Sequence, residues 1–218
     1  MQQEWHGRYA EMRQLWSGRP NGALVAEVSD LAPGRVLDVG CGEGADAVWL
    51  ARRGWDVTAL DVSGVALARA AEHASEAGVD VRWVHAGLVE AALPAGSFDL
   101  VSAQYPALLR TPGFDAEHTL LAAVAPGGVL LLVHHAGIDQ QPVREDGFDP
   151  ADYVSPAMVA ALLDNGWHLE VDEQRPREVP PGDAARGPAP PDVRRGGCAR
   201  RGAGGGRDRH HRADPGRP

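Results

Sequence analysis

The sequence predicts an α/β fold with a doubly wound, mostly parallel sheet, and three observations support this prediction. Short apolar runs alternate with helical patterns from Arg35 to about Val171, as in repeated βαβ units. The first run opens directly into a loop of alternating glycines, residues 40–44. An acid stands at the end of each of the first two runs, Asp38 and Asp61. Helices that join parallel strands cross over right-handed and so cover both faces of the sheet.

Each predicted strand is a short apolar run between turn residues, and each predicted helix has an apolar face of helical period. The predicted strands are residues 35–39, 56–60, 81–85, 98–103, 129–134 and 168–172. The predicted helices are residues 46–53, 65–77, 116–124 and 155–166. Ser63 is a suitable N-cap for the second helix, and the Ala-Pro-Gly-Gly sequence at 125–128 ends the third.

Residues 1–34 are predicted to form a helical cap ahead of the sheet domain, residues 35–178. Apolar residues recur there at roughly helical spacing: Trp5, Tyr9, Met12, Leu15 and Trp16. Two interpretations stay open. The helix packs on the domain as plain structure, or it covers a ligand as a lid that uses Trp16 and Arg19.

Residues 179–218 form a tail dominated by Gly, Pro, Arg, Ala and Asp. From Pro180 onward its sequence contains one branched aliphatic residue, Val193. Such a segment buries too little apolar area to offset its ordering entropy, so we expect a disordered tail. The sheet is then expected to lack the final antiparallel strand. A native basic tail and an out-of-frame read of a GC-rich gene both account for this composition.

Charge and cysteine content narrow the class of protein. All basic residues are arginine, and the net charge is −14 over residues 1–178 and +5 over residues 179–218. The acidic body argues against non-specific binding to nucleic acid or anionic membranes, whereas the basic tail could in principle bind either one. The chain has no apolar run long enough for a membrane helix and no signal-peptide pattern, and its two cysteines form no disulfide framework. These features predict a cytoplasmic location; the oligomeric state is left open.

The glycine loop alone fits two kinds of nucleotide site. Residues 40–45 match the dinucleotide pattern G-x-G-x-x-A, and Asp61 lies at a suitable distance to hold a ribose. A nicotinamide-dependent oxidoreductase is therefore one alternative. Asp38, two residues before the first glycine, counts against that alternative and gives the pattern Asp-x-Gly-x-Gly-x-Gly.

This pattern resembles motif I of the class I S-adenosylmethionine-dependent methyltransferases, which have a Rossmann-like fold. Residues 56–63 look like the second strand of that family, residues 98–103 like its fourth, and residues 120–132 like the helix, turn and fifth strand that follow. The resemblance covers residues from about 5 to 178. Within the superfamily, the sequences at 16–21 and 42–46 look like bacterial small-molecule enzymes of the tellurite-resistance and thiopurine-methyltransferase-like type.

The resemblance implies a set of residues that bind S-adenosylmethionine. Asp38 would lie near the methionine amino group with the backbone of the glycine loop, Asp61 would accept from the ribose hydroxyls, and Val62 would contact the adenine. The third strand usually delivers an acid to the adenine amine, but glycine stands at that place here. The implied cofactor-binding residues are Asp38, Gly40, Cys41, Gly42, Asp61, Val62, Gly87, Leu88 and Gln104.

The predicted function is methyl transfer to a small-molecule acceptor, with substrate contacts from Trp16, Tyr105 and His134. His134 and His135 are candidate bases, but the pattern selects no catalytic residue. No metal site is expected, and Cys41 is read as a small loop residue. The acidic segment 137–153 favours a neutral or cationic acceptor. A damaged or non-catalytic relative, suggested by Gly87 and the expected missing strand, is a further alternative.

Overall fold

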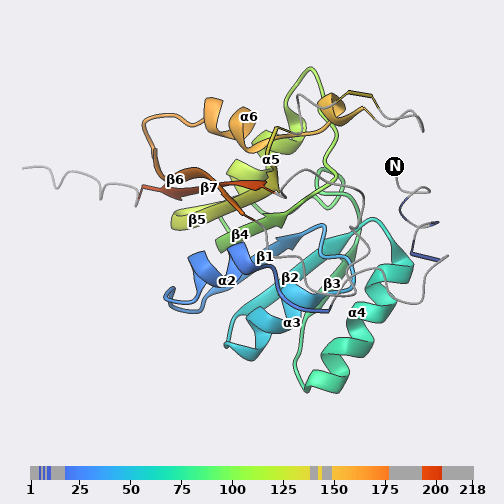
Figure 1. The fold of residues 1–218 in the computed structure, drawn as a ribbon. Coiled ribbons are helices and arrows are strands. Elements are labelled where there is room, and N and C mark those ends of the chain that lie inside the picture. Colours follow the sequence, from blue (N-terminus) through green and yellow to red (C-terminus); the bar gives the residue numbers. More distant parts are fainter. Residues whose placement is uncertain are drawn as a thin grey trace, which may run out of the picture.

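A computed structural model shows a single sheet with helices on both faces, and describes residues 5, 7, 9, 10, 18–137, 142, 143, 149–176 and 193–202 (Figure 1). The strands are β1 (Arg35–Val39), β2 (Asp56–Asp61), β3 (Arg82–His85), β4 (Phe98–Gln104), β5 (Val124–His135), β6 (Trp167–Pro176) and β7 (Val193–Arg201). The helices are α2 (Gly22–Val28), α3 (Ala45–Arg52), α4 (Gly64–Ala77), α5 (Asp115–Ala123), α6 (Pro156–Ala161) and the short 3₁₀ helix η2 (Pro150–Asp152).

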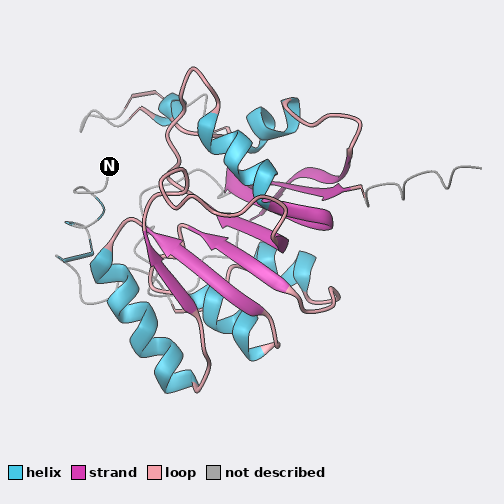
Figure 2. Ribbon diagram, turned by 180° about the vertical axis from the view of Figure 1, so that it is seen from behind, coloured by secondary structure: helices cyan, strands magenta, loops and turns pink. Residues whose placement is uncertain are grey.

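The strand order is β3-β2-β1-β4-β5-β7-β6. The pairs among β1 to β5 are parallel, and β7 is antiparallel to both of its neighbours, β5 and β6. Helices α2, α3 and α4 cover one face, and α5 and α6 cover the other (Figures 1 and 2). The predicted α/β fold with a doubly wound, mostly parallel sheet is confirmed.

Two hydrophobic clusters fill the space between the sheet and these helices, because successive strand residues point to opposite faces. Val36, Leu100 and Leu131 belong to the cluster under α2 and α3. Their sequence neighbours Leu37 and Val101 belong to the cluster under α5 and α6. The alternation therefore places Asp38, two residues after Val36, on the α2 and α3 face.

The helix boundaries follow local signals with some differences from the sequence prediction. The Ser63 hydroxyl accepts a hydrogen bond from the Ala66 N–H at the start of α4, which confirms the predicted N-cap. α6 ends at Ala161, earlier than predicted. β5 begins at Val124 rather than at 129, because Val124 already pairs with Phe98 of β4. The register between the two strands then shifts between Phe98 and Leu100.

The expectation that the final antiparallel strand is missing is wrong. β7 lies between β5 and β6 and pairs with both along its length, within the segment that the sequence assigns to a disordered tail. The prediction was wrong because composition indicates only how much apolar side-chain area a segment can bury. Strand pairing instead uses backbone N–H and C=O groups, and every residue type except proline provides both. The damaged-relative alternative thereby loses one of its two supports. The rest of the tail lies outside the described residues.

The N-terminal region contributes α2, which the sequence analysis included in the 1–34 cap without delimiting it. Ala23, Leu24 and Val28 pack into the cluster on the α3 face. Trp16, expected to contact substrate, lies outside the described residues. Within the described part of the chain, no helix combines the length and apolarity needed to cross a bilayer.

Candidate functional site

The glycine loop leaves β1 at the carboxyl edge of the sheet and requires glycine at three places. Gly40, Gly42 and Gly44 have φ values of 71°, 52° and 82°, in the left-handed region that other residues rarely adopt. The loop turns toward β2, where the Gly40 and Cys41 N–H groups donate to the Leu60 carbonyl at 2.9 and 3.0 Å. A Cβ at residue 44 would also lie 2.7 Å from the Ala70 Cβ, so the loop and α4 are packed closely.

Asp38 is a buried acid with an unused acceptor. Its side chain is 2% exposed, and its Oδ2 has no hydrogen-bond partner among the described residues. Burial raises the pKa of this carboxyl well above its ordinary value, and the nearby charges of Asp46 and Asp61 raise it further. A cationic group placed here would relieve both effects, because it favours the ionised form.

Asp61 closes β2 and holds the glycine loop. Its Oδ2 accepts from the Gly42 N–H at 2.9 Å and its Oδ1 from the Ser63 N–H at 2.8 Å. Burial raises its pKa, and these two hydrogen bonds act in the opposite direction. Each carboxylate oxygen has a second lone pair, so Asp61 can hold the loop and still accept from a ligand hydroxyl.

Asp46 is a third buried acid, and the sequence analysis assigned it no role. It lies in the first turn of α3, where its Oδ1 accepts from the Asn21 N–H at 2.7 Å and its Oδ2 from the Asn21 side-chain amide at 2.8 Å. Burial raises its pKa, and the bonds from Asn21 oppose this shift. An acid in a first helical turn is a recognisable sequence signal, but its Asn21 partner is separated by 25 residues.

Gln104, at the end of β4, lies on the same face as Asp38. Asp38 and Ser102 are register partners on neighbouring strands, and Gln104 is two residues further toward the carboxyl edge. Its amide nitrogen donates to the Ser102 hydroxyl at 3.1 Å, while its buried Oε1 has no partner in the described structure. Two unpartnered acceptors therefore stand at the ends of adjacent strands β1 and β4.

Gly87 and Leu88 follow β3 and have different surroundings. Leu88 is buried in the core cluster, so it contributes packing. At Gly87, a Cβ would lie 2.2 Å from Oε2 of Glu90. The Glu90 carboxylate thus occupies the space of the missing side chain, a contact that no sequence pattern indicated.

Tyr105, His134 and His135 lie together at the ends of β4 and β5. Tyr105 has a φ of 52°, unusual for a residue other than glycine, and its ring centroid is 4.8 Å from that of His135 and 6.4 Å from that of His134. Backbone strain of this kind is concentrated at functional sites. The sequence prediction that Tyr105 borders the acceptor stays a prediction.

His134 is held by its surroundings and is a weak base. Its Nδ1 accepts from the His135 N–H at 2.8 Å, which leaves Nε2 as the protonated nitrogen of the neutral ring. Burial lowers the pKa of His134 to about 4; the neighbouring His135 contributes, and a hydrogen bond with the Pro106 backbone opposes the shift. The ring is therefore neutral at pH 7, with its basic nitrogen already bonded.

Cys41 is half-buried in the glycine loop. Burial raises the pKa of its thiol well above the ordinary value, and the charges of Asp38 and Asp61 add to this shift. The thiol is therefore protonated at neutral pH, and a protonated thiol is a poor nucleophile. Val62 adjoins this region: its carbonyl lies 3.1 Å from Nε2 of His85.

Comparison with known families agrees with this geometry. Residues 36–128 match the family described as "Methyltransferase domain". An uncharacterized methyltransferase of Mycobacterium tuberculosis is 37% identical over 123 residues, 56% of this chain and 61% of that protein. A ribosomal RNA small subunit methyltransferase C of Alcanivorax borkumensis is 33% identical over 128 residues, 56% of this chain and 39% of its own length. The chain thus spans less than two thirds of these curated relatives.

Solved structures share the fold over nearly the whole chain. One, from work on the conversion of a disulfide bond into a thioacetal group during echinomycin biosynthesis, has a TM-score of 0.72 at 24% identity, covering 94% of this chain and 93% of that one. The 1,6-didemethyltoxoflavin-N1-methyltransferase of Burkholderia thailandensis, solved with S-adenosylhomocysteine, has a TM-score of 0.62 at 19% identity, covering 92% and 87%. Residues 36–128 therefore match the methyltransferase domain family, and these solved structures have the same fold as this chain.

Proposed function

We propose that this protein transfers a methyl group from S-adenosylmethionine to a small-molecule acceptor. The observation that supports this most directly is the pair of unpartnered buried acceptors, Asp38 Oδ2 and Gln104 Oε1, at the ends of neighbouring strands. A primary ammonium carries three N–H donors and a positive charge, so the amino group of the cofactor's methionine part matches both acceptors. When bound, S-adenosylmethionine supplies a methyl carbon already activated by its sulfonium.

The charge of the site favours this cofactor over a dinucleotide. Asp38, Asp46 and Asp61 are all buried near the glycine loop. A cationic sulfonium and ammonium are attracted to such a site, whereas a pyrophosphate dianion is repelled by it. The nicotinamide alternative is therefore disfavoured on electrostatic grounds, in agreement with the family match.

Further residues of the chain are assigned to the rest of the cofactor. Asp61 has lone pairs to accept from the ribose hydroxyls, beside Val62. We assign Glu90, whose carboxylate fills the space at Gly87, to accept from the exocyclic amine of the base. Gly87 therefore gives room for another acid instead of only removing a contact.

The acceptor side is assigned to the ends of β4 and β5, where the rings of Tyr105 and His135 are in tilted contact. His134 positions this pair through its bond to the His135 N–H, and its low pKa makes it a poor proton acceptor. Methyl transfer requires in-line alignment and exclusion of water, and we assign both tasks to these residues. A base is needed only when the acceptor carries a proton that must leave. The acidic net charge of the chain, −9, favours a small molecule over RNA, although one relative is named for ribosomal RNA.

The direct test is calorimetric titration with S-adenosylmethionine and, separately, with NADH. We expect the wild type to bind S-adenosylmethionine, and Asp38→Asn and Gln104→Leu each to weaken it by about 10- to 100-fold, the effect of about 1.4–2.8 kcal/mol. Glu117→Gln is the matched control. Glu117 is also buried with an unpartnered oxygen, but it lies on α5, whose other buried residues pack on the opposite face. Binding of NADH alone would refute the assignment.

A further inference from the structure

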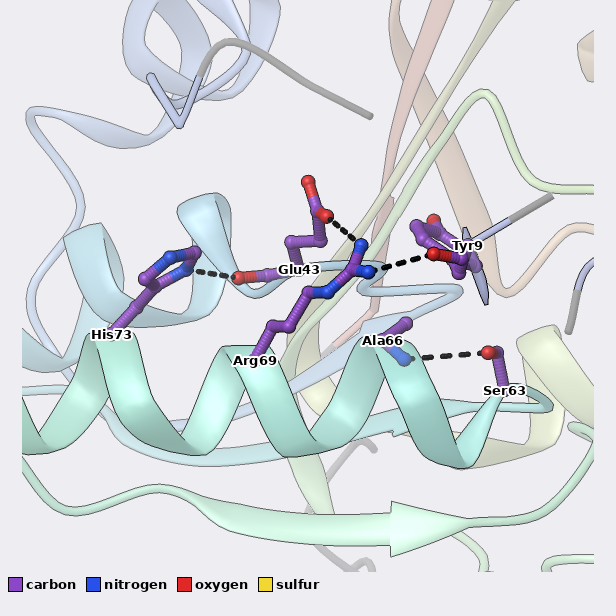
Figure 3. A network of polar contacts seen from close by, with 6 residues as sticks. All are labelled: Tyr9, Glu43, Ser63, Ala66, Arg69 and His73. Atoms are coloured by element: carbon purple, nitrogen blue, oxygen red, sulfur yellow. Dashed lines mark hydrogen bonds and ion pairs between the residues drawn. The ribbon is translucent and has the colours of Figure 1, made fainter. Parts of the chain in front are cut away.

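We infer that Arg69 is a positioning residue that couples the N-terminal segment around Tyr9 to the glycine loop, so that docking of this segment and cofactor binding favour one another. The inference rests on the proposed function only in taking S-adenosylmethionine as the ligand of the loop. Arg69 lies in the middle of α4 and contacts two parts of the chain that are far apart in sequence (Figure 3).

One terminal nitrogen of the Arg69 guanidinium binds the glycine loop. Its Nη1 lies 2.8 Å from Oε1 of Glu43, the residue between Gly42 and Gly44. The Glu43 side chain is only 5% exposed and that of Arg69 is 21% exposed, so this ion pair is largely shielded from water. Nδ1 of His73, one turn further along α4, lies 3.0 Å from the Glu43 carbonyl and fixes the loop backbone as well.

The other terminal nitrogen binds the N-terminal segment. The Arg69 Nη2 donates to the backbone carbonyl of Tyr9 at 2.7 Å. The Tyr9 side chain is 3% exposed and packs with Trp5, Val65 and Ala66 at the first turn of α4. Figure 3 shows Tyr9 and Glu43 on either side of the same guanidinium.

A shared guanidinium links the two contacts energetically. Its planar fork is positioned by the first contact, so less rotamer entropy is lost in forming the second. A ligand that orders the glycine loop around Glu43 therefore orders Arg69, and with it the Tyr9 carbonyl contact. Coupling of this kind is reciprocal, because each event must change the affinity of the other by the same factor.

Two variants of Arg69 test the coupling in the full-length chain. Arg69→Gln removes the charge, and Arg69→Lys keeps the ion pair with Glu43 but replaces the fork by a single ammonium that cannot serve two separate acceptors in the same way. We expect both variants to bind S-adenosylmethionine about 5- to 50-fold more weakly, within the usual range of coupling between sites. Arg82→Gln, which removes an exposed arginine at the start of β3, is the control and should bind as the wild type does.

The second readout is tryptic cleavage of the N-terminal segment, followed by intact mass. The sequence offers trypsin sites at Arg8 and Arg13. In the wild type and in Arg82→Gln, S-adenosylmethionine should slow cleavage at these sites. In Arg69→Gln and Arg69→Lys, cleavage should be faster and nearly insensitive to the ligand. Adding Tyr9→Ala to Arg69→Gln should weaken ligand affinity little beyond either change alone.

The outcomes separate the possible failures. If the wild type binds S-adenosylmethionine but both Arg69 variants bind equally well, or keep ligand-dependent protection, Arg69 has no coupling role and the inference is overturned. If Arg69→Gln does not fold, the lysine variant decides the question. If the folded wild type binds no S-adenosylmethionine at all, the proposed function fails first and takes the coupling with it.

Discussion

The chain is rich in glycine in two quite different places, the loop after β1 and the middle of β7. In the loop, Gly40, Gly42 and Gly44 all have positive φ, and the space at Gly44 is closed by α4. In β7, Gly196 and Gly197 lie inside a strand, opposite Val133 and Leu132 of β5. The same residue type is thus a requirement of the backbone in one place and a weak strand former in the other. Replacing glycine should therefore lower the free energy of unfolding in the loop and raise it in β7.

The largest effect is expected at Gly44. Alanine there must adopt φ near 82° and place its Cβ 2.7 Å from that of Ala70. The left-handed conformation and the overpacking together should lower the free energy of unfolding by about 3 kcal/mol, as measured by urea denaturation. Gly78→Ala is the control, because Gly78 has a φ of 66° but no atom within 4 Å of its missing Cβ. Equal losses at the two positions would contradict the close packing.

Asp38→Asn, beside the glycine loop, should raise the free energy of unfolding although it weakens ligand binding. The raised pKa means that the folded state holds a proton more tightly than the unfolded chain does, so the wild type loses stability as pH rises from about 3.9 through the folded pKa. The neutral variant should lack this loss and be more stable than the wild type at pH 7 without ligand. Urea titrations between pH 4 and 8 measure both slopes. A variant with the same pH slope as the wild type would show that Asp38 is not the group responsible.

In β7 we expect substitution of glycine to stabilise the fold. Gly197→Val should raise the free energy of unfolding by about 1 kcal/mol, because it removes backbone entropy from the unfolded chain and adds a β-branched side chain next to Leu132. Gly127→Val in β5 is the control. Gly127 has no atom within 4 Å of its missing Cβ, but its φ of 81° should make valine destabilising. A loss of stability at both positions would mean that β7 also depends on its glycines.

The smallest effect is expected from the arginines at the end of β7. Arg200 forms an ion pair with Glu170 at 3.0 Å, but the two side chains are 41% and 35% exposed. Arg200→Ala should therefore change the free energy of unfolding by about 0.5 kcal/mol or less, and high salt should reduce the difference further. A loss above that range would indicate that the Arg200 bond to the Gly127 carbonyl carries more of the stability than the ion pair does.

The parallel half of the fold was predictable from sequence because its signals are local. Apolar runs at 35–39 and 56–60, a glycine loop and an N-cap at Ser63 each specify backbone geometry within a few residues. β7 gave no such signal, since its pairing relies on backbone groups of strands that are distant in sequence. Composition alone therefore predicted disorder where the structure has a strand.

The candidate site divides in the same way. Asp38 and Asp61 were predicted to belong to the cofactor site because each ends one of the first two apolar runs, and Asp38 stands two residues before the first glycine of the motif. The partners of Asp46 and Glu43 were not predicted, because Asn21 and Arg69 lie 25 and 26 residues away and meet them only in the folded chain. The choice between His134 and His135 likewise needed the structure, since only geometry shows that Nδ1 of His134 is bonded to the next N–H.

The position of β7 has a consequence for the order in which the chain folds during synthesis. β6 pairs in the sheet through β7, yet β7 is the later of the two to leave the ribosome. Residues 167–176 must therefore wait for the segment that follows them, while the open edge of β5 is exposed to other unpaired strands. A nascent chain stalled between these two strands would present that edge to chaperones or to its neighbours on the same messenger.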